Sequence, residues 1–262
     1  RLLAKASEDR YQTAAGLAAD LRECLTQLQS KGEISDFPLG RSDFSAELRV
    51  PQRLYGRQAE QQVLSAALHR AAAGSAELVL ISGYPGVGKT ALVHEMYSRV
   101  VAQGGFFAEG KFDQFSASAP MAQLVHALRD LLVQILTQRE ATVAQWKTAL
   151  QLAVGSNGKL LTDFMPELLL IIGPQPSVAE IGPTESQNRF ALLVQNFLRV
   201  FATHDHPLIL FLDDLQWADA ASLKLLQLVL EDVGSSHLLI IGTYRDQEIG
   251  ATHPFASTLH QL

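Results

Sequence analysis

The chain has 262 residues, of which 47% are hydrophobic and 18% are charged, and its formal net charge at pH 7 is −6. These proportions are those of a folded globular protein and exclude an intrinsically disordered chain. The acidic balance gives no support to binding of nucleic acid or of an anionic membrane. The single cysteine, Cys24, excludes an internal disulfide, and no apolar run approaches the roughly 18–20 residues that span a bilayer. We therefore expect a cytoplasmic protein of one large domain or two small ones.

The N-terminal residues predict part of a separate domain. From Leu17 onward, apolar side chains recur at i, i+4, i+7, i+8 and i+11, which makes one face of an amphipathic helix over residues 13–28, with Thr13 as its N-cap. Residues 1–12 are too short to cover this face, so we expect the chain to be a fragment of a longer protein. Residues 33–49 carry scattered Gly, Pro, Ser and Asp without periodicity, and they predict a linker.

Residues 50–262 predict a compact α/β domain. Short apolar stretches that alternate with helical stretches are typical of a buried parallel sheet flanked by helices. The segment between the second and third strands is longer than a simple crossover and has helical periodicity, so it predicts a helical insert. The chain ends soon after the fourth strand, so we expect this domain to be incomplete at its C-terminus. The expected strands are 78–82, 104–112, 207–214 and 237–245, and the expected helices are 58–73, 89–101, 121–136, 143–154 and 184–202.

The strongest motif is GYPGVGKT, Gly83 to Thr90, which matches the P-loop pattern G-x-x-x-x-G-K-[ST]. Its glycines allow the backbone to wrap closely, so that successive N–H groups point at phosphate oxygens. Lys89 is expected to reach the β- and γ-phosphates, and the Thr90 hydroxyl is expected to ligate Mg²⁺. The alternative is a glycine-rich turn, but a predicted strand precedes the loop and a helix follows it. The candidate nucleotide-binding residues are Gly83, Tyr84, Pro85, Gly86, Val87, Gly88, Lys89 and Thr90.

The third strand runs into the sequence FLDDLQWADA (211–220), which begins with two adjacent carboxylates after its apolar residues. Asp213 is the candidate Mg²⁺ partner, because a P-loop ATPase needs a carboxylate at the C-terminal end of a neighbouring strand. Asp214 is the candidate base that orients or deprotonates the attacking water. The alternative for both is a strand that merely ends at solvent. Trp217 is expected to pack in the following turn, and Asp219 to cap the next helix.

The fourth strand ends in GTYRDQE, which places Arg245 at the same edge of the sheet as the P-loop. There the guanidinium either senses the γ-phosphate or forms an ordinary ion pair with Asp246 or Glu248. The residues leave both interpretations open, and Arg245 is kept as a candidate catalytic residue beside Lys89 and Asp214.

Five stretches, in order along residues 50–262, resemble the STAND branch of the AAA-related P-loop ATPases. The similarity is greatest to the ATPase module of large bacterial signalling proteins that join a Ser/Thr protein-kinase-like domain to sensor and histidine-kinase domains. In that family the first stretch packs against adenine, which implies four contacts to the base. These are Leu54, Tyr55, Gly56 and Arg57. The five stretches are LYGRQAE (54–60), GYPGVGKT (83–90), GKFDQF (110–115), LFLDDLQWAD (210–219) and GTYRDQE (242–248).

The opening KASEDRYQTAAGLAADL (5–21) resembles the last helices of a protein-kinase C-lobe. This resemblance implies that residues 1–32 end a protein-kinase-like domain, and that Arg10 braces the glutamate of an activation segment. The sequence contains no H-R-D, D-F-G or V-A-I-K stretch, so the chain is not by itself a protein kinase.

The motifs predict a module that binds and hydrolyses ATP with Mg²⁺ and acts as a regulatory switch within a larger signalling kinase. Its expected partners are ATP or ADP, the flanking kinase and sensor domains of the same polypeptide, and further copies of itself in a nucleotide-dependent association; neither a membrane nor a nucleic acid is expected. Two alternatives remain. One is a scaffold that binds nucleotide without turnover and uses the insert, residues 116–202, as its partner surface. The other is a transcription regulator with a STAND-type motor, which the acidic balance does not support.

Overall fold

The computed structural model divides the chain into two compact units, Arg1–Arg53 and Leu54–Leu262. The protein-kinase-like assignment of residues 1–32 and the linker over 33–49 stay predictions, and Arg10 lies outside the described residues. None of the helices in the described part of the chain has the length and apolar content of a membrane-spanning segment. The structure describes residues 11, 13–35, 37–40, 56–102, 104–114, 120–178, 182–249 and 253–259.

The first unit contains helix α1, Ala14–Lys31. Its predicted N-cap is confirmed, because the Thr13 hydroxyl oxygen accepts a hydrogen bond from the Gly16 N–H at 2.9 Å. The helix ends at Gly32, whose φ of 75° is favourable for a residue without a side chain. Three leucines of the predicted apolar stripe, Leu21, Leu25 and Leu28, are exposed within this unit, with Leu21 at 60% relative exposure.

The second unit is built on a four-stranded parallel sheet with strand order β1-β4-β3-β2. The order places β1 beside β4, β4 beside β3 and β3 beside β2. Because all three pairs are parallel, the C-terminal ends of the four strands lie at one edge of the sheet. Every residue of β3 is buried, as expected for a central parallel strand. The strands are β1 Ala76–Ser82, β2 Phe106–Lys111, β3 Leu208–Asp213 and β4 Leu238–Tyr244.

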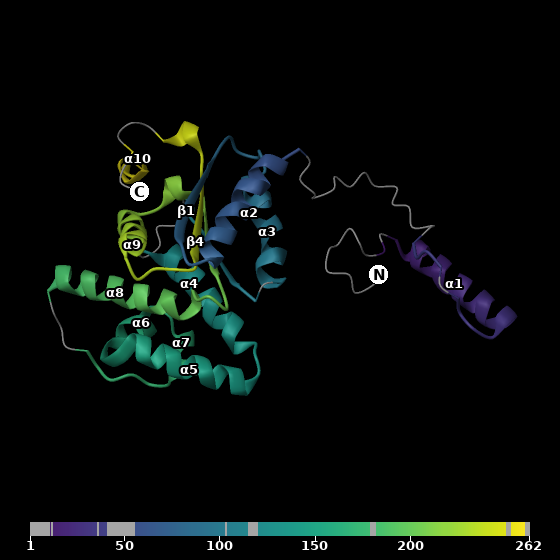
Figure 1. Ribbon diagram of the computed structural model, residues 1–262, viewed down its shortest axis with the longest axis horizontal. Coiled ribbons are helices and arrows are strands. Elements are labelled where there is room, and N and C mark those ends of the chain that lie inside the picture. The colour runs from purple at the N-terminus through teal and green to yellow at the C-terminus, as the bar shows by residue number, and fades with distance from the viewer. Residues whose placement is uncertain are drawn as a thin grey trace. The chain divides into compact units, whose positions relative to one another are not determined.

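Helices cover both faces of this sheet (Figure 1). On one face, α2 and α3 pack against side chains such as Phe211 and Ile241. On the other face, α4 and α9 pack against the sheet, and the rest of the insert joins the same hydrophobic core, which includes alternate sheet residues such as Leu210 and Ile240. The helices of this unit are α2 Gln58–Ala72, α3 Lys89–Ala102, α4 Ala122–Leu136, α5 Glu140–Val154, α6 Gly158–Phe164, α7 Glu167–Ile172, α8 Pro183–Phe201, α9 Ala220–Glu231 and α10 Pro254–Leu259.

The predicted α/β class, the parallel sheet and the helical insert between the second and third strands are confirmed. The insert contains two helices that the sequence analysis missed, α6 and α7. They have 7 and 6 residues, which is too few for a helical period to show in the sequence. They close the insert around a shared core with α5 and α8 that includes Leu161 and Leu168, both fully buried.

Asp219 is the N-cap of α9, as predicted, and it also anchors the insert. Its carboxylate accepts hydrogen bonds from the N–H groups of Ala221 and Ser222 at 3.1 and 3.0 Å, and from the Met121 N–H, just before α4, at 3.2 Å. Burial raises the pKa of the Asp219 carboxyl, but these bonds and that of the Ser222 hydroxyl outweigh burial and hold the pKa below its ordinary 3.8.

Replacing Asp219 with alanine is therefore expected to lower the stability of the second unit by about 1–2 kcal/mol at pH 7. Because the folded-state pKa lies below the unfolded value, this stabilisation is present above about pH 4 and is lost as the pH falls through the folded-state pKa. Thermal unfolding of the wild-type protein and the variant should differ at pH 7 and converge in acid. Asp219→Asn keeps an oxygen acceptor, so its loss of stability at pH 7 should be smaller than that of Asp219→Ala. An equal transition temperature for Asp219→Ala at pH 7 would contradict the anchoring role.

Candidate nucleotide-binding site

The P-loop connects the end of β1 to the start of α3. Gly83, Gly86 and Gly88 have φ angles of 149°, 76° and 93°, which residues with a side chain rarely adopt. The Lys89 ammonium donates hydrogen bonds to the carbonyl oxygens of Gly83 at 2.8 Å and Tyr84 at 3.1 Å. The lysine is therefore folded back over the loop, at the N-terminal end of α3, where a phosphate group would be bound.

Thr90, the last residue of the motif, lies against the carboxylate at the end of β3. Its hydroxyl is 3.2 and 3.1 Å from the two carboxylate oxygens of Asp213, which is only 3% exposed. Thr243 on β4 also donates its hydroxyl to Asp213. A buried carboxylate beside a threonine hydroxyl is a set of hard oxygen ligands that suits Mg²⁺. The two predicted metal ligands thus lie together and fit the ion.

Asp214 follows in the left-handed region, with φ 58° and ψ 49°. Its N–H donates to the Thr243 hydroxyl at 3.1 Å, so β4 holds this strained turn in place. Its carboxylate accepts from Gln216 Nε2 at 3.0 Å and from Arg245 Nε at 3.1 Å. The candidate base is therefore buried at the site but engaged by an amide and a guanidinium.

Arg245 at the end of β4 forms two ion pairs. Its guanidinium donates to Glu248 at 2.8 Å and to Asp214. Hydrogen bonding to Glu248, followed by the charge of Asp214, raises the pKa of Arg245 above its ordinary value, although partial burial opposes this. The ion pair with Glu248 is confirmed as one of the two predicted interpretations. The pair with Asp214 was not anticipated, and γ-phosphate sensing stays a prediction.

One cavity of ≈350 Å³ at the C-terminal edge of the sheet is lined by Lys89, Thr90, Asp213, Asp214 and Arg245. Four of its charged residues lie at or just after the ends of three strands, β2, β3 and β4, and its P-loop residues lie just before or at the start of α3. Gly83, Tyr84 and Val87 do not line it, and Tyr84 is 61% exposed. The lining residues are Pro85, Gly86, Gly88, Lys89, Thr90, Ala91, Lys111, Asp213, Asp214 and Arg245.

The predicted adenine contacts are described only in part, since Leu54 and Tyr55 lie outside the described residues. Arg57 reaches the P-loop, donating to the Val87 carbonyl oxygen at 3.2 Å, and it pairs with Glu60 at 2.7 Å. Gly56 has a φ of 76°. Contact between this segment and the base stays a prediction.

Lys111 was missed as a site residue, although it lies in the stretch GKFDQF. It is the last residue of β2 and pairs in register with Asp213. A signal was present in the sequence, because residues that end neighbouring parallel strands meet at the same edge. The strand order that makes β2 and β3 neighbours is visible only in the structure.

A second, wider cavity of ≈700 Å³ adjoins the first. The two cavities share Lys111, Asp214 and Arg245. The wider cavity is also lined by Trp217, which packs against the core as predicted, and by Glu248. Its remaining lining residues are Phe112, Asp113, Gln114 and Gln123. The P-loop cavity therefore adjoins a larger, polar space beside α4.

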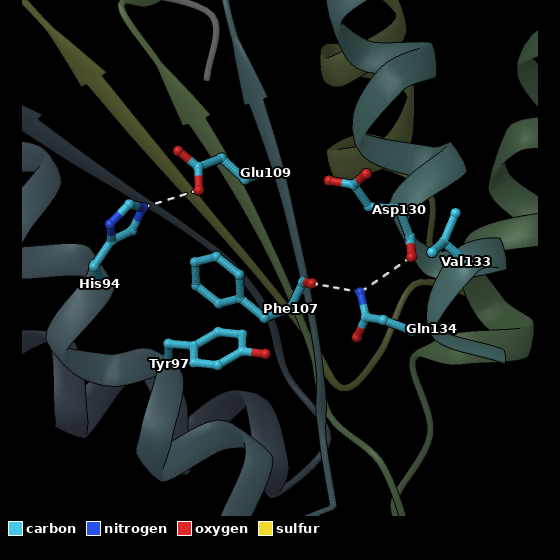
Figure 2. A pocket seen from close by; sticks show the side chains of 7 residues that line it. All are labelled: His94, Tyr97, Phe107, Glu109, Asp130, Val133 and Gln134. Atoms are coloured by element: carbon cyan, nitrogen blue, oxygen red, sulfur yellow. Dashed lines mark hydrogen bonds and ion pairs between the residues drawn. The ribbon is translucent and has the colours of Figure 1, made fainter. Parts of the chain in front are cut away.

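A separate cavity of ≈460 Å³ lies at β2, an outer strand of the described sheet (Figure 2). Gln134 donates to the carbonyl oxygen of Phe107 at 2.8 Å, and Glu109 lies 2.9 Å from His94. Charged groups and a side-chain bond at an outer strand protect it from pairing with another strand. None of the candidate nucleotide ligands lines this cavity. Its lining residues are His94, Tyr97, Phe107, Glu109, Asp130, Val133 and Gln134.

A parallel sheet, a P-loop after its first strand and a buried carboxylate at the end of the third define a P-loop NTPase. Residues 53–241 match the family model of the AAA ATPase domain. Because the match covers well over half of the chain, the protein belongs to the AAA ATPase domain family.

Two proteins that are named histidine kinases are similar to this chain. The first is Hybrid signal transduction histidine kinase G of Dictyostelium discoideum, 36% identical over 251 residues, which are 88% of this chain and 7% of that protein. The second is Histidine protein kinase 1 of Candida albicans, 25% identical over 171 residues, which are 59% of this chain and 7% of that protein. The chain therefore spans a small part of each relative.

Proposed function

We propose that the second unit binds ATP with Mg²⁺ and hydrolyses it, and that it acts as a regulatory switch. The observation that supports this most directly is the composition of the ≈350 Å³ cavity. It gathers the P-loop lysine, a threonine hydroxyl, two buried carboxylates and an arginine from three separate segments of the chain. Each of these groups has a distinct task in phosphoryl transfer to water.

In the proposed reaction, Lys89 leaves its two loop carbonyls and binds the phosphate oxygens. Thr90 and Asp213 would hold Mg²⁺, which when bound supplies charge neutralisation for the triphosphate. Asp214 orients the water whose oxygen attacks the γ-phosphorus, and it takes up the proton as the bond to the bridging oxygen breaks. Arg245 must first leave Asp214, because the ion pair occupies the oxygens that the water needs.

The same ion pair suggests how the switch would work. Arg245 links the ends of β3 and β4 through Asp214, and Glu248 extends this link into the turn after β4. A γ-phosphate would attract the guanidinium and release both carboxylates. We propose that this change is transmitted to the flanking domains of the polypeptide, with self-association of the module as a further consequence.

The names of the two relatives support a place in signal transduction. Both are named histidine kinases, and the similar segment is a small part of each. We infer that the parent of this chain is likewise a signalling kinase in the cytoplasm. Membership of the STAND branch, a bacterial source and a preceding protein-kinase-like domain are part of the same proposal.

The assignment of Asp214 is tested with Asp214→Asn in the full-length protein. Phosphate release from ATP is expected to fall by about 10²-fold or more, while ATP affinity changes by less than about threefold, because the residue acts on water and not on the nucleotide. Asp246→Asn is the matched control, since it removes the same charge from an exposed position in the next turn. Unchanged turnover in Asp214→Asn would show that the base is another group.

A scaffold that binds nucleotide without turnover is the second candidate. It is favoured by the engagement of Asp214 with Arg245 and Gln216, which blocks the base as long as the arrangement persists. Tight binding of ATP by the wild-type full-length protein, with no phosphate release, would establish this function in place of hydrolysis.

A further inference from the structure

Lys111 lies where the nucleotide cavity and the wider cavity meet, and neither the P-loop motif nor the family resemblance gives it a role. We propose that Lys111 is a movable counter-ion of the site. It neutralises Asp213 before the metal binds, and it then moves to the terminal phosphate of ATP, so that the site distinguishes ATP from ADP. This inference rests on the proposed function of nucleotide and Mg²⁺ binding.

The first step is the environment of Asp213. Two of its partners, Thr90 and Thr243, are neutral hydroxyls. Its ion pair is with the Lys111 ammonium, 3.7 Å from carboxylate Oδ2. Because a buried carboxylate is costly without a nearby cation, the ammonium stands in for the metal charge.

The second step is the mobility of Lys111. Its side chain is 64% exposed, whereas that of Asp213 is 5% exposed. The ammonium is a compact charge on a flexible four-carbon chain, so it can change partner without movement of the backbone. A divalent cation bound by Asp213 and Thr90 would repel the Lys111 ammonium, because both cations are attracted to the same carboxylate.

The third step is the destination. A metal ion held by Asp213 and Thr90 would supply charge neutralisation for the terminal phosphates, so the residues beside Asp213 would lie near that end of the triphosphate. Lys111 lines both cavities and faces this end from β2, while Lys89 and Arg245 approach it from the P-loop and from β4. The terminal phosphate of ATP offers the displaced ammonium a new anionic partner. ADP lacks that group.

The test compares Mg·ATP and Mg·ADP binding by titration calorimetry in the full-length protein. Lys111→Met is expected to weaken ATP binding about tenfold and ADP binding less than about twofold, because only ATP loses a charge-assisted hydrogen bond. Lys111→Arg should restore most of the preference for ATP. Lys147→Met is the matched control, an exposed lysine of α5 that lines neither cavity.

A second readout needs no nucleotide. Mn²⁺ binding to the nucleotide-free protein, followed by electron paramagnetic resonance, should tighten several-fold in Lys111→Met, because the competing cation is gone. Mn²⁺ binding that is unchanged or weaker would overturn the counter-ion role. If Lys111→Met lowered the affinities for ATP and ADP equally, or lowered neither, the specificity role would be overturned while the proposed function stayed intact. If the wild-type protein bound neither nucleotide, the proposed function would fail and this inference with it.

Discussion

Replacing Lys89 with alanine is expected to lower the affinity of the protein for ATP by about 100-fold or more. The lysine is 9% exposed, at the N-terminal end of α3, and its ammonium is held within the loop that would surround the phosphates. Charge-assisted hydrogen bonds to phosphate contribute about 1.5–3 kcal/mol each, and two of them correspond to this loss. The affinity is measured with and without Mg²⁺, and both values should fall, since the ammonium binds phosphate oxygens directly.

The fold should survive this substitution. The carbonyl oxygens of Gly83 and Tyr84 lose their bonds to Lys89, but Tyr84 is exposed and this part of the loop reaches solvent. An unchanged transition temperature in thermal unfolding would confirm that the loss concerns the site and not stability. Lys224→Ala, at an exposed position of α9, is the control for removal of a positive charge. Retention of wild-type affinity by Lys89→Ala would contradict phosphate binding at this loop.

The sheet and much of the candidate site were predictable because both depend on short-range patterns. Each strand is an apolar run of a few residues that ends in a polar turn, and parallel strands bring such turns to one edge. Asp213 and Thr90 of the P-loop are 123 residues apart in the sequence, and the structure places their side chains in hydrogen-bonding contact. This proximity follows because the carboxyl ends of parallel strands lie at one edge of a sheet, which the strand pattern is sufficient to indicate.

The contacts between neighbouring strand ends were not predictable in the same way. The pairs Asp214–Arg245 and Lys111–Asp213 depend on which strands are adjacent and on their register, and neither is encoded in a local pattern. The order β1-β4-β3-β2 brings β4 and β2 to opposite sides of β3. The two carboxylates at the end of β3 therefore face different cations, Asp213 towards β2 and Asp214 towards β4. This division of partners supports the proposal that the two carboxylates have different roles, Asp213 towards a metal ion and Asp214 towards water.

Replacing Asp213 with asparagine is expected to remove the Mg²⁺ dependence of ATP binding. The substitution keeps the shape of the side chain and an oxygen that accepts from Thr90 and Thr243, but it removes the charge that attracts the metal. In the wild-type protein, Mg²⁺ should strengthen ATP binding by about tenfold or more over the value in EDTA, as one additional strong ionic contact would. In Asp213→Asn the two values should be nearly equal and close to the wild-type value in EDTA.

This pattern differs from that of Lys89→Ala, which lowers affinity under both conditions, so the two variants separate metal binding from phosphate binding. Asp205→Asn is the control, because Asp205 is 86% exposed and lies in the turn before β3, at its other end. The Lys111 ammonium loses its partner in Asp213→Asn, but it is largely exposed, so hydration offsets the loss and the transition temperature should change little. A full Mg²⁺ effect in Asp213→Asn would show that the metal is held by other residues, and the assignment of the carboxylates at the end of β3 would then be wrong.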